Sequence, residues 1–212
     1  MFFMHPLASG KIEGTDIIAI KNRMNNLFFI PSGEDWIVID AGSDAGAVKR
    51  SMEKMSIDGR RVKSVFLTHT DYDHVASIVL FPNAEICLSE QEKQMIDGST
   101  FRRLFEKNRL PELSAFNKVT GVTDNEVIVS GDHKVRIILA PGHTIGSAMY
   151  AVDEKYLFTG DAFKAVHGQI SVHPFSMDKK QAHETICSLK EELNKFEKVF
   201  TAHYGLLESH IE

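Results

Sequence analysis

Cysteine is scarce in this chain and basic residues are outnumbered by acidic ones, and each shortage argues against a class of protein. Of its 212 residues only Cys87 and Cys187 are cysteines, too few and too far apart for a disulfide framework or a cysteine-ligated metal site. Lysine and arginine number 24 against 29 acidic residues, giving a net charge of -5. The chain therefore lacks the basic surface typical of nucleic-acid binding, and its two isolated thiols fit a reducing cytoplasm.

Long apolar runs are also missing. The run at Met1-Phe2-Phe3-Met4 has no basic residues ahead of it and is broken by His5-Pro6, and no later run is long enough to cross a bilayer. No linker, internal repeat or low-complexity segment divides the chain. With 43% hydrophobic and 25% charged residues, the sequence predicts one soluble cytoplasmic domain over residues 1–212, with neither nucleic acid nor membrane as a partner. It does not indicate an oligomeric state.

The densest group of chemically active side chains follows an apolar run at residues 64–68. This run has the β-branched and aromatic residues of a buried strand. Four potential metal ligands come directly after it: His69, Asp71, Asp73 and His74. Imidazole and carboxylate groups suit divalent zinc, iron or manganese. An extended backbone would point positions 69, 71 and 73 the same way, with His74 facing a second direction.

Three later apolar runs end in the same manner. Residues 135–140 precede Pro141-Gly142-His143-Thr144, residues 156–158 precede Thr159-Gly160-Asp161, and residues 199–201 precede Ala202-His203. Each predicted strand thus ends in a histidine or an aspartate beside a small residue. Because a strand fixed in a core holds short side chains in one geometry, these strand ends together predict a metal site.

This arrangement resembles that of the metallo-β-lactamase-fold metallohydrolases, a superfamily that includes glyoxalase II, the metallo-lactonases and the flavodiiron proteins. Its pattern is His-x-His-x-Asp-His, then a His, an Asp and a His, each at a strand end. The chain matches this pattern, in order, with His69, Asp71, Asp73, His74, His143, Asp161 and His203. Ile39-Asp40-Ala41-Gly42 and His143-Thr144-Ile145-Gly146-Ser147 are further similarities, and only Asp71 departs, since most members carry His there.

The resemblance spans about residues 15–205 and implies an α+β fold, the four-layer αββα sandwich, with the site at one edge. Hydrophobic periodicity by itself supports only a mixed α and β fold. From the apolar spacing we expect helices over residues 44–55 and 179–196, and hairpins over residues 126–139 and 147–159.

The resemblance also implies a reaction. It assigns His69, Asp71 and His143 to a first metal ion, Asp73, His74 and His203 to a second, and Asp161 to both, with a water or hydroxide completing the bridge. Two divalent ions roughly 3.5 to 4 Å apart acidify such a water and polarise the group that it attacks. The expected activity is hydrolysis of an ester, thioester, lactone or phosphodiester in a small-molecule substrate. Asp161 and Asp73 are the expected catalytic residues, with Asp73 passing a proton to the leaving group.

Asp71 leaves two other interpretations open. A carboxylate at this position makes the first site harder and more anionic than an imidazole would, which favours iron or manganese relative to zinc. Flavodiiron proteins carry a Glu there and reduce oxygen or nitric oxide, so a diiron redox protein with a partner as electron donor is one alternative. If Asp71 falls short of the ion, a noncatalytic or single-metal binding module is the other. No Ser-His-Asp set or phosphate-binding glycine loop competes with metal chemistry.

Two further segments carry open predictions. Asp40 is either a carboxylate that orients a ligand histidine or a helix cap. Ser89 and Glu92 form a capping-box signature at the start of a charged helical stretch, residues 90–117. That stretch is either a lid or a solvated helix; as a lid it would contribute the cations Arg102, Arg103, Lys107 and Arg109.

Three of the histidines outside the ligand pattern carry predictions of their own. His133 falls in a predicted turn and is expected to be exposed to solvent. His167 and His173 lie in the loop that follows Asp161, where either could meet the substrate or donate a proton. A single loop histidine more often does neither.

Overall fold

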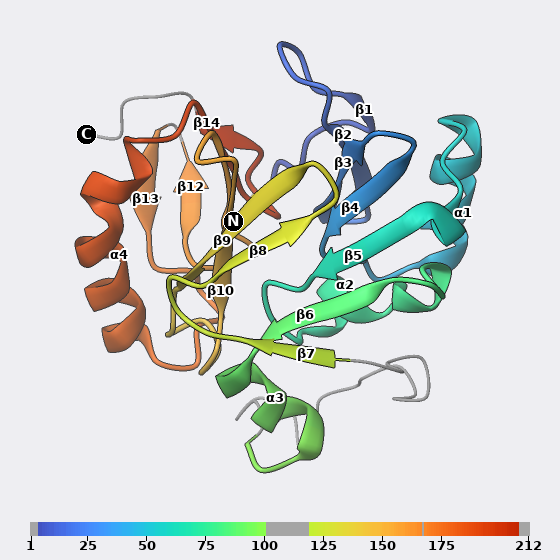
Figure 1. Cartoon of the computed structure of the whole chain (residues 1–212). Coiled ribbons are helices and arrows are strands. Elements are labelled where there is room, and N and C mark those ends of the chain that lie inside the picture. The colour runs from blue at the N-terminus through green and yellow to red at the C-terminus, as the bar shows by residue number, and fades with distance from the viewer. Residues whose placement is uncertain (1–3, 101–118, 167, 208–212) are drawn as a thin grey trace.

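Two β-sheets form the centre of the protein, whose computed structural model describes residues 4–100, 119–166 and 168–207 (Figure 1). The first sheet contains seven strands in chain order: β1 (Gly10–Lys11), β2 (Ile18–Asn22), β3 (Asn25–Ser32), β4 (Asp35–Ile39), β5 (Val62–Phe66), β6 (Glu85–Ser89) and β7 (Val119–Val122). Neighbours from β1 to β4 are antiparallel, and those from β4 to β7 are parallel.

The second sheet contains six strands in the order β15-β14-β11-β10-β9-β8. They are β8 (Val127–Ser130), β9 (His133–Leu139), β10 (Ala148–Val152), β11 (Tyr156–Phe158), β14 (Lys198–Phe200) and β15 (Leu206–Leu207). All neighbours are antiparallel except β11 and β14. The predicted hairpins are therefore confirmed as β8–β9 and β10–β11. A separate hairpin, β12 (Lys164–Val166) and β13 (Gln169–Ser171), was not predicted.

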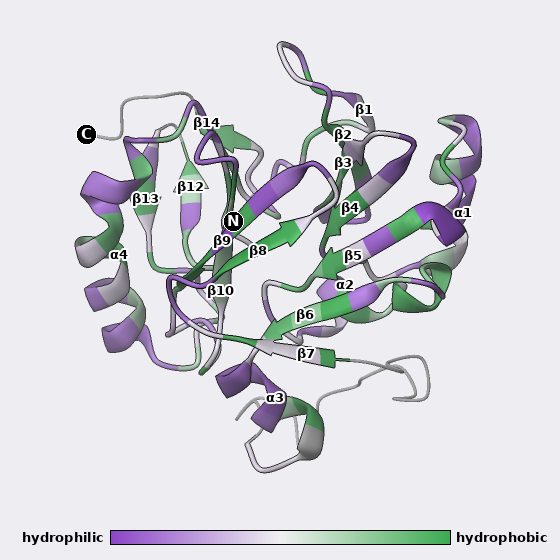
Figure 2. Cartoon of the chain, in the orientation of Figure 1, coloured by the Kyte–Doolittle hydropathy of each residue, from purple (hydrophilic) through white to green (hydrophobic). Residues whose placement is uncertain are grey.

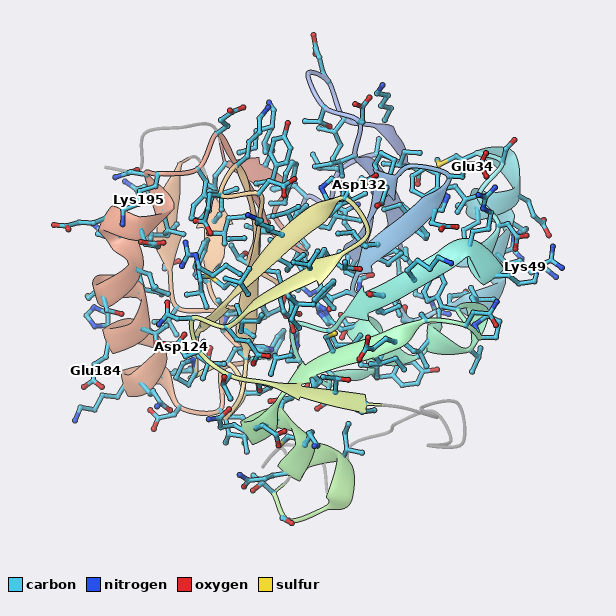
Figure 3. The ribbon with its side chains drawn as sticks, in the orientation of Figure 1. Glu34, Lys49, Asp124, Asp132, Glu184 and Lys195 are labelled. Atoms are coloured by element: carbon cyan, nitrogen blue, oxygen red, sulfur yellow. The ribbon has the colours of Figure 1, made fainter. Side chains whose placement is uncertain are left out.

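Helices cover the outer face of each sheet (Figure 1). Helix α1 (Ala45–Lys54) packs Val48 and Met52 against the first sheet, and α4 (Lys179–Leu193) packs Ile186 and Leu193 against the second. Their outward sides are mainly hydrophilic in Figure 2, and Figure 3 shows Lys49 and Glu184 extending away from the sheets. The shorter helices are α2 (Tyr72–Val75), α3 (Glu90–Asp97) and the 3-10 turns at Gly59–Arg61 and Ile78–Leu80. Both long helices were predicted from apolar spacing.

Aromatic side chains fill the space between the two sheets. Phe28 and Phe66 of the first sheet meet Phe158 and Tyr150 of the second, with ring centroids 5.1 and 5.2 Å apart. All four are buried, and each such side chain contributes about 1.5–3 kcal/mol through its removal from water. Helix, sheet, sheet and helix thus form four layers, which confirms the expected αββα sandwich. Within the described residues, no helix is both long enough and apolar enough to cross a membrane.

His133 is not the exposed turn residue that the sequence predicted. Its side chain is only 19% exposed, because Nδ1 lies 2.7 Å from Asp153 Oδ2 and Nε2 lies 2.8 Å from the carbonyl oxygen of Pro31. Pro31 belongs to the first sheet, and Asp153 follows β10 of the second. The imidazole therefore joins the sheets through partners 20 and 102 positions away, which a local turn pattern cannot reveal.

Candidate metal centre

The predicted ligands converge because four strands end near one another. β5 ends at Phe66, β11 at Phe158 and β14 at Phe200, each three residues before a ligand, and β9 ends four residues before His143. Backbone hydrogen bonds hold the segments that follow: Ala148 N donates to Thr68 O at 2.9 Å, and Ala202 N donates to Gly160 O at 3.3 Å. The ligand-bearing segments of the two sheets therefore meet at one edge.

Asp161 lies at the middle of the cluster. Its Oδ2 is 3.5 Å from His143 Nε2, whereas its Oδ1 is 3.7 Å from His74 Nε2 and 3.2 Å from His203 Nε2. The two oxygens of one carboxylate thus face two groups of histidines. His69, His74 and Asp161 also offer ligand atoms within 4.8 Å of one another, so the two sides adjoin at Asp161.

The first group contains His69, Asp71 and His143. Asp71 Oδ2 lies 3.5 Å from His69 Nε2 and 3.2 Å from His143 Nε2, so this short carboxylate reaches the cluster. The three ligand atoms all lie within 4.8 Å of one another. Asp71 has an extended backbone and directly precedes α2, which explains how it can share a direction with His69.

The second group contains Asp73, His74 and His203. Asp73 Oδ2 lies 3.8 Å from His74 Nε2 and 3.5 Å from His203 Nε2. Asp73 and His74 belong to the first turn of α2, so the extended alternation expected over positions 69, 71 and 73 stops at Asp71. His74 does face the second group, although its ring centroid is only 4.1 Å from that of His69. Asp73 is 41% exposed, whereas the side chains of the other six predicted ligands are largely buried.

Hydrogen bonds orient both histidines of the second group. Asp40 Oδ2 accepts from His74 Nδ1 at 2.8 Å, and Met24 O accepts from His203 Nδ1 at 2.6 Å. Each imidazole is thereby held with Nε2 directed into the cluster. Asp40 also accepts from the backbone N–H of Thr68 at 2.8 Å, whereas α1 is capped by Asp44. Of the two roles considered for Asp40, the orienting one is correct.

Charge is distributed unevenly over the cluster. Burial alone would raise the pKa of Asp161, but the imidazoles of His203, His74 and His173 hold it well below its usual value. Burial lowers the pKa of His143 to about 3. For His74, burial opposes protonation, yet the carboxylates of Asp40, Asp73 and Asp161 raise the pKa well above its usual value. The second group therefore favours positive charge more strongly than the first.

Glu92 accepts hydrogen bonds from the loops that carry the first group. It is fully buried, and its Oε1 accepts from the backbone N–H and the hydroxyl of Thr70, at 2.9 and 2.7 Å. Its Oε2 accepts from Thr144 Oγ1 at 2.7 Å and from Gly146 N at 3.1 Å. Ser89 caps α3 as predicted, but the Glu92 carboxylate is directed to the loops that carry His69, Asp71 and His143. The capping signature locates this residue without revealing its second role.

One glycine permits the close approach of two ligand loops. Gly160 has a φ of +52°, and a Cβ there would lie 2.4 Å from Thr68 Oγ1. Thr68 and Gly160 directly precede His69 and Asp161. A side chain at position 160 would push these two ligands apart, so glycine is required here.

The chemistry of the cluster fits divalent metal ions. His69 Nε2, His74 Nε2 and Asp161 Oδ1 are buried without a hydrogen-bond partner. Buried polar atoms of this kind are costly unless a ligand satisfies them. Two atoms bound to one ion at about 2.1 Å lie about 3.0–3.5 Å apart at octahedral or tetrahedral angles, close to the separations found here. Imidazole nitrogens and carboxylate oxygens suit zinc, iron and manganese.

His173 also lies at this cluster. It is buried, and its Nε2 is 3.8 Å from Asp161 Oδ2. The other loop histidine, His167, lies outside the described residues. So do residues 101–117 of the charged stretch that was predicted as either a lid or a solvated helix, including Arg102, Arg103, Lys107 and Arg109. The described part of that stretch, residues 90–100, forms α3, which ends at Asp97 with Gly98 as its C-cap.

Three exposed apolar side chains adjoin the ligand-bearing segments. Tyr72, 52% exposed, stands between Asp71 and Asp73. Met24, also 52% exposed, accepts from His203 through its carbonyl oxygen, and the ring of Phe175, 51% exposed, lies 5.8 Å from that of His173. The sequence carried no signal that singled out this apolar border.

Comparisons with known proteins bear on the family and the fold of this chain. Residues 20–186 match the family described as the metallo-beta-lactamase superfamily. A beta-lactamase-like protein 2 homolog of Drosophila melanogaster is 27% identical over 159 residues, which cover 71% of this chain and 51% of the relative. The probable polyketide biosynthesis zinc-dependent hydrolase PksB of Bacillus subtilis (strain 168) is 27% identical over 128 residues, covering 59% of this chain and 48% of the relative. The chain thus spans about half the length of these two relatives.

Solved structures show the same fold. The archaeal metallo-beta-lactamase superfamily protein ST1585 from Sulfolobus tokodaii superposes with a TM-score of 0.65 over 91% of this chain and 81% of that one, at 21% identity. At this level of identity the likeness concerns the fold alone.

Proposed function

Because this chain belongs to the metallo-beta-lactamase superfamily, we propose that it is a metal-dependent hydrolase with a two-ion centre. His69, Asp71 and His143 hold the first ion, His74, Asp73 and His203 hold the second, and Asp161 contacts both. The observation that carries the proposal is the convergence of these groups around buried atoms that lack a hydrogen-bond partner. The zinc-dependent hydrolase PksB among its relatives supports zinc as one of the ions that it uses.

Each residue has a separable task in this proposal. When bound, the ions acidify a water molecule and polarise the oxygen of the bond to be broken. Asp161 fixes the position of one group relative to the other, because Oδ2 faces His143 and Oδ1 faces His203. Asp73 directs Oδ2 toward His203 and is the most exposed of the ligands, so we assign proton transfer to the leaving group to its Oδ1.

The substrate class is an ester, thioester, lactone or phosphodiester of a small molecule. Hydrolysis of each requires the same water attack beside an oxygen that develops charge. Met24, Tyr72 and Phe175 expose apolar side chains on segments next to the ligands, which supports a substrate with an apolar group beside the bond that is cleaved.

The direct test is turnover by protein stripped with a chelator and reloaded with zinc, iron or manganese. We expect metal-restored hydrolysis of at least one model substrate from the four classes, lowered at least about 1,000-fold in Asp161→Asn with the fold intact. His183→Gln, at an exposed position of α4, is the matched control and should retain activity. Two bound ions with no turnover of any class would contradict the proposal.

Asp71 favours a second candidate, a diiron redox protein, because its carboxylate reaches the first group. Protein purified without added metal and without a metal-affinity column distinguishes the two. Iron in both positions, with oxygen or nitric oxide consumed in the presence of a reductant, would favour redox chemistry. Metal-dependent hydrolysis without such consumption would favour the hydrolase.

A further inference from the structure

The strongest unexplained feature is His173. Its side chain is 2% exposed, and neither ring nitrogen has a hydrogen-bond partner. A buried imidazole with two unsatisfied nitrogens is unfavourable unless a ligand occupies at least one of them. The surrounding protein offers aromatic rings in their place: His143 at 4.8 Å, His203 at 5.9 Å and Tyr204 at 6.1 Å between centroids.

The backbone holds His173 in this position. The residue follows β13, and the adjacent Val172 packs against the apolar core beneath α4. Ser176 N donates to His173 O at 3.1 Å, which closes a turn. Met177 N then donates to His143 O at 3.0 Å, so the turn is tied directly to the loop of a proposed ligand.

The position of the imidazole relative to Asp161 identifies the ion that it faces. His173 Nε2 lies 3.8 Å from Asp161 Oδ2, the same oxygen that lies 3.5 Å from His143 Nε2. The other oxygen, Oδ1, faces His74 and His203. A separation of 3.8 Å is too long for a hydrogen bond and close to that of two atoms bound to one ion.

We propose that His173 is a further ligand of the first metal ion, which it contacts through Nε2 beside His143 and Asp161. The ligand atoms of these three residues lie within 4.8 Å of one another, as do those of His69, Asp71 and His143. The first ion then has three imidazoles and two carboxylates available to it, whereas the second has two imidazoles and two carboxylates. This inference rests on the proposed two-ion centre.

Metal affinity measured by competition with a chromophoric chelator tests the proposal. In His173→Gln we expect one of the two ions to bind at least about 10-fold more weakly and the other to keep its affinity, since even residues behind a ligand change affinity 10- to 100-fold. His183→Gln on α4 makes the same substitution at an exposed position and should bind both ions as the unmodified chain does. Unchanged affinity for both ions in His173→Gln overturns the inference and leaves the two-ion centre standing.

A measurement on the unmodified chain avoids dependence on the folding of a variant. With imidazole nitrogens labelled with ¹⁵N and two zinc ions bound by elemental analysis, five histidines should show metal-shifted nitrogen resonances: His69, His74, His143, His173 and His203. Four shifted histidines would overturn the inference alone. A chain that saturates with fewer than two ions would overturn the two-ion centre and, with it, this assignment.

Discussion

The two ligand groups on either side of Asp161 differ in what lies behind them. Acceptors stand directly behind the imidazoles of the second group: the Asp40 carboxylate behind His74 and the Met24 carbonyl behind His203. Behind the first group, Glu92 instead binds the backbone and hydroxyls of the ligand loops. The second group is oriented through the Nδ1 atoms of both histidines, whereas the first is oriented through its loops and through Thr68 Oγ1, which lies 3.0 Å from His69 Nδ1.

The two groups also differ in the pKa values of their histidines. Carboxylates raise the pKa of His74 and, against the effect of burial, that of His203, so positive charge is favoured in the second group before any ion binds. In the first group burial lowers the pKa of His143, so its imidazole stays neutral. The two groups thus differ in their histidines: carboxylates favour protonation of His74 and His203, whereas His143 stays neutral beside Asp71, whose pKa is held well below its usual value.

Glu92→Gln should have the largest effect on this comparison. The amide replaces one acceptor oxygen with a donor that would face Thr144 Oγ1 and Gly146 N, so a buried network loses its match. We expect the free energy of unfolding to fall by about 2–4 kcal/mol and the first ion to bind about 10- to 100-fold more weakly. Urea denaturation and chelator competition measure the two effects. Retained affinity for the first ion would show that Glu92 does not position the ligands of the first group.

Asp40→Asn should affect the opposite side. An amide nitrogen placed against His74 Nδ1 no longer accepts, so the imidazole loses its orientation. The second ion should bind about 10- to 100-fold more weakly. The first ion should weaken by a smaller factor, because Asp40 reaches His69 only through Thr68 Oγ1. The same competition assay applies. Equal weakening of both ions in Asp40→Asn and Glu92→Gln would show that the two groups do not behave separately.

Asp71→His should sharpen the comparison through metal identity. The change replaces a hard anionic ligand of the first group with a neutral imidazole. We expect the ratio of zinc to iron plus manganese in the purified protein to rise about 10-fold, read by elemental analysis of matched preparations. A ratio that stays the same would remove Asp71 as the source of metal preference.

His133→Gln probes a histidine outside both groups and should have the smallest effect. Partial burial opposes protonation of His133, but its hydrogen bonds to Asp153 and Pro31 O raise its pKa above the usual 6.5. The folded state therefore binds this proton more tightly than the unfolded state, and the stabilisation is complete below pH 6.5 and lost as pH rises through the raised value.

The expected contribution is about 1 kcal/mol. Thermal or urea unfolding of the unmodified chain and His133→Gln over a pH series measures it as a difference. The difference should shrink with rising pH; one that grows with pH would contradict the assignment of a protonated imidazole.

The site was predictable from the sequence where its signals are local. An apolar run followed by His or Asp marks each strand end, and the structure brings all seven predicted residues together. The sequence singled out Asp40 but left two roles open for it, because its contact with His74 spans 34 positions. Only the fold decides between orienting a ligand and capping a helix.

Residues whose partners are distant were missed or only half understood. Glu92 meets Thr70 and Thr144, 22 and 52 positions away, so the capping box described only its helical role. His173 was one of two loop histidines that the sequence could not distinguish, because its burial beside Asp161 depends on contacts with other loops. His133 was wrongly expected to be exposed, because both of its partners come from distant parts of the chain.

The cluster lies across the seam between the sheets. His69 to His74 follow β5 of the first sheet, whereas His143, Asp161 and His203 follow strands of the second. A nascent chain emerging from the ribosome can pair the first sheet long before residue 203 is made, but it cannot complete the cluster. The proposed ions would therefore tie the two sheets to each other, and their withdrawal should loosen the junction of the sheets before it disturbs either sheet alone.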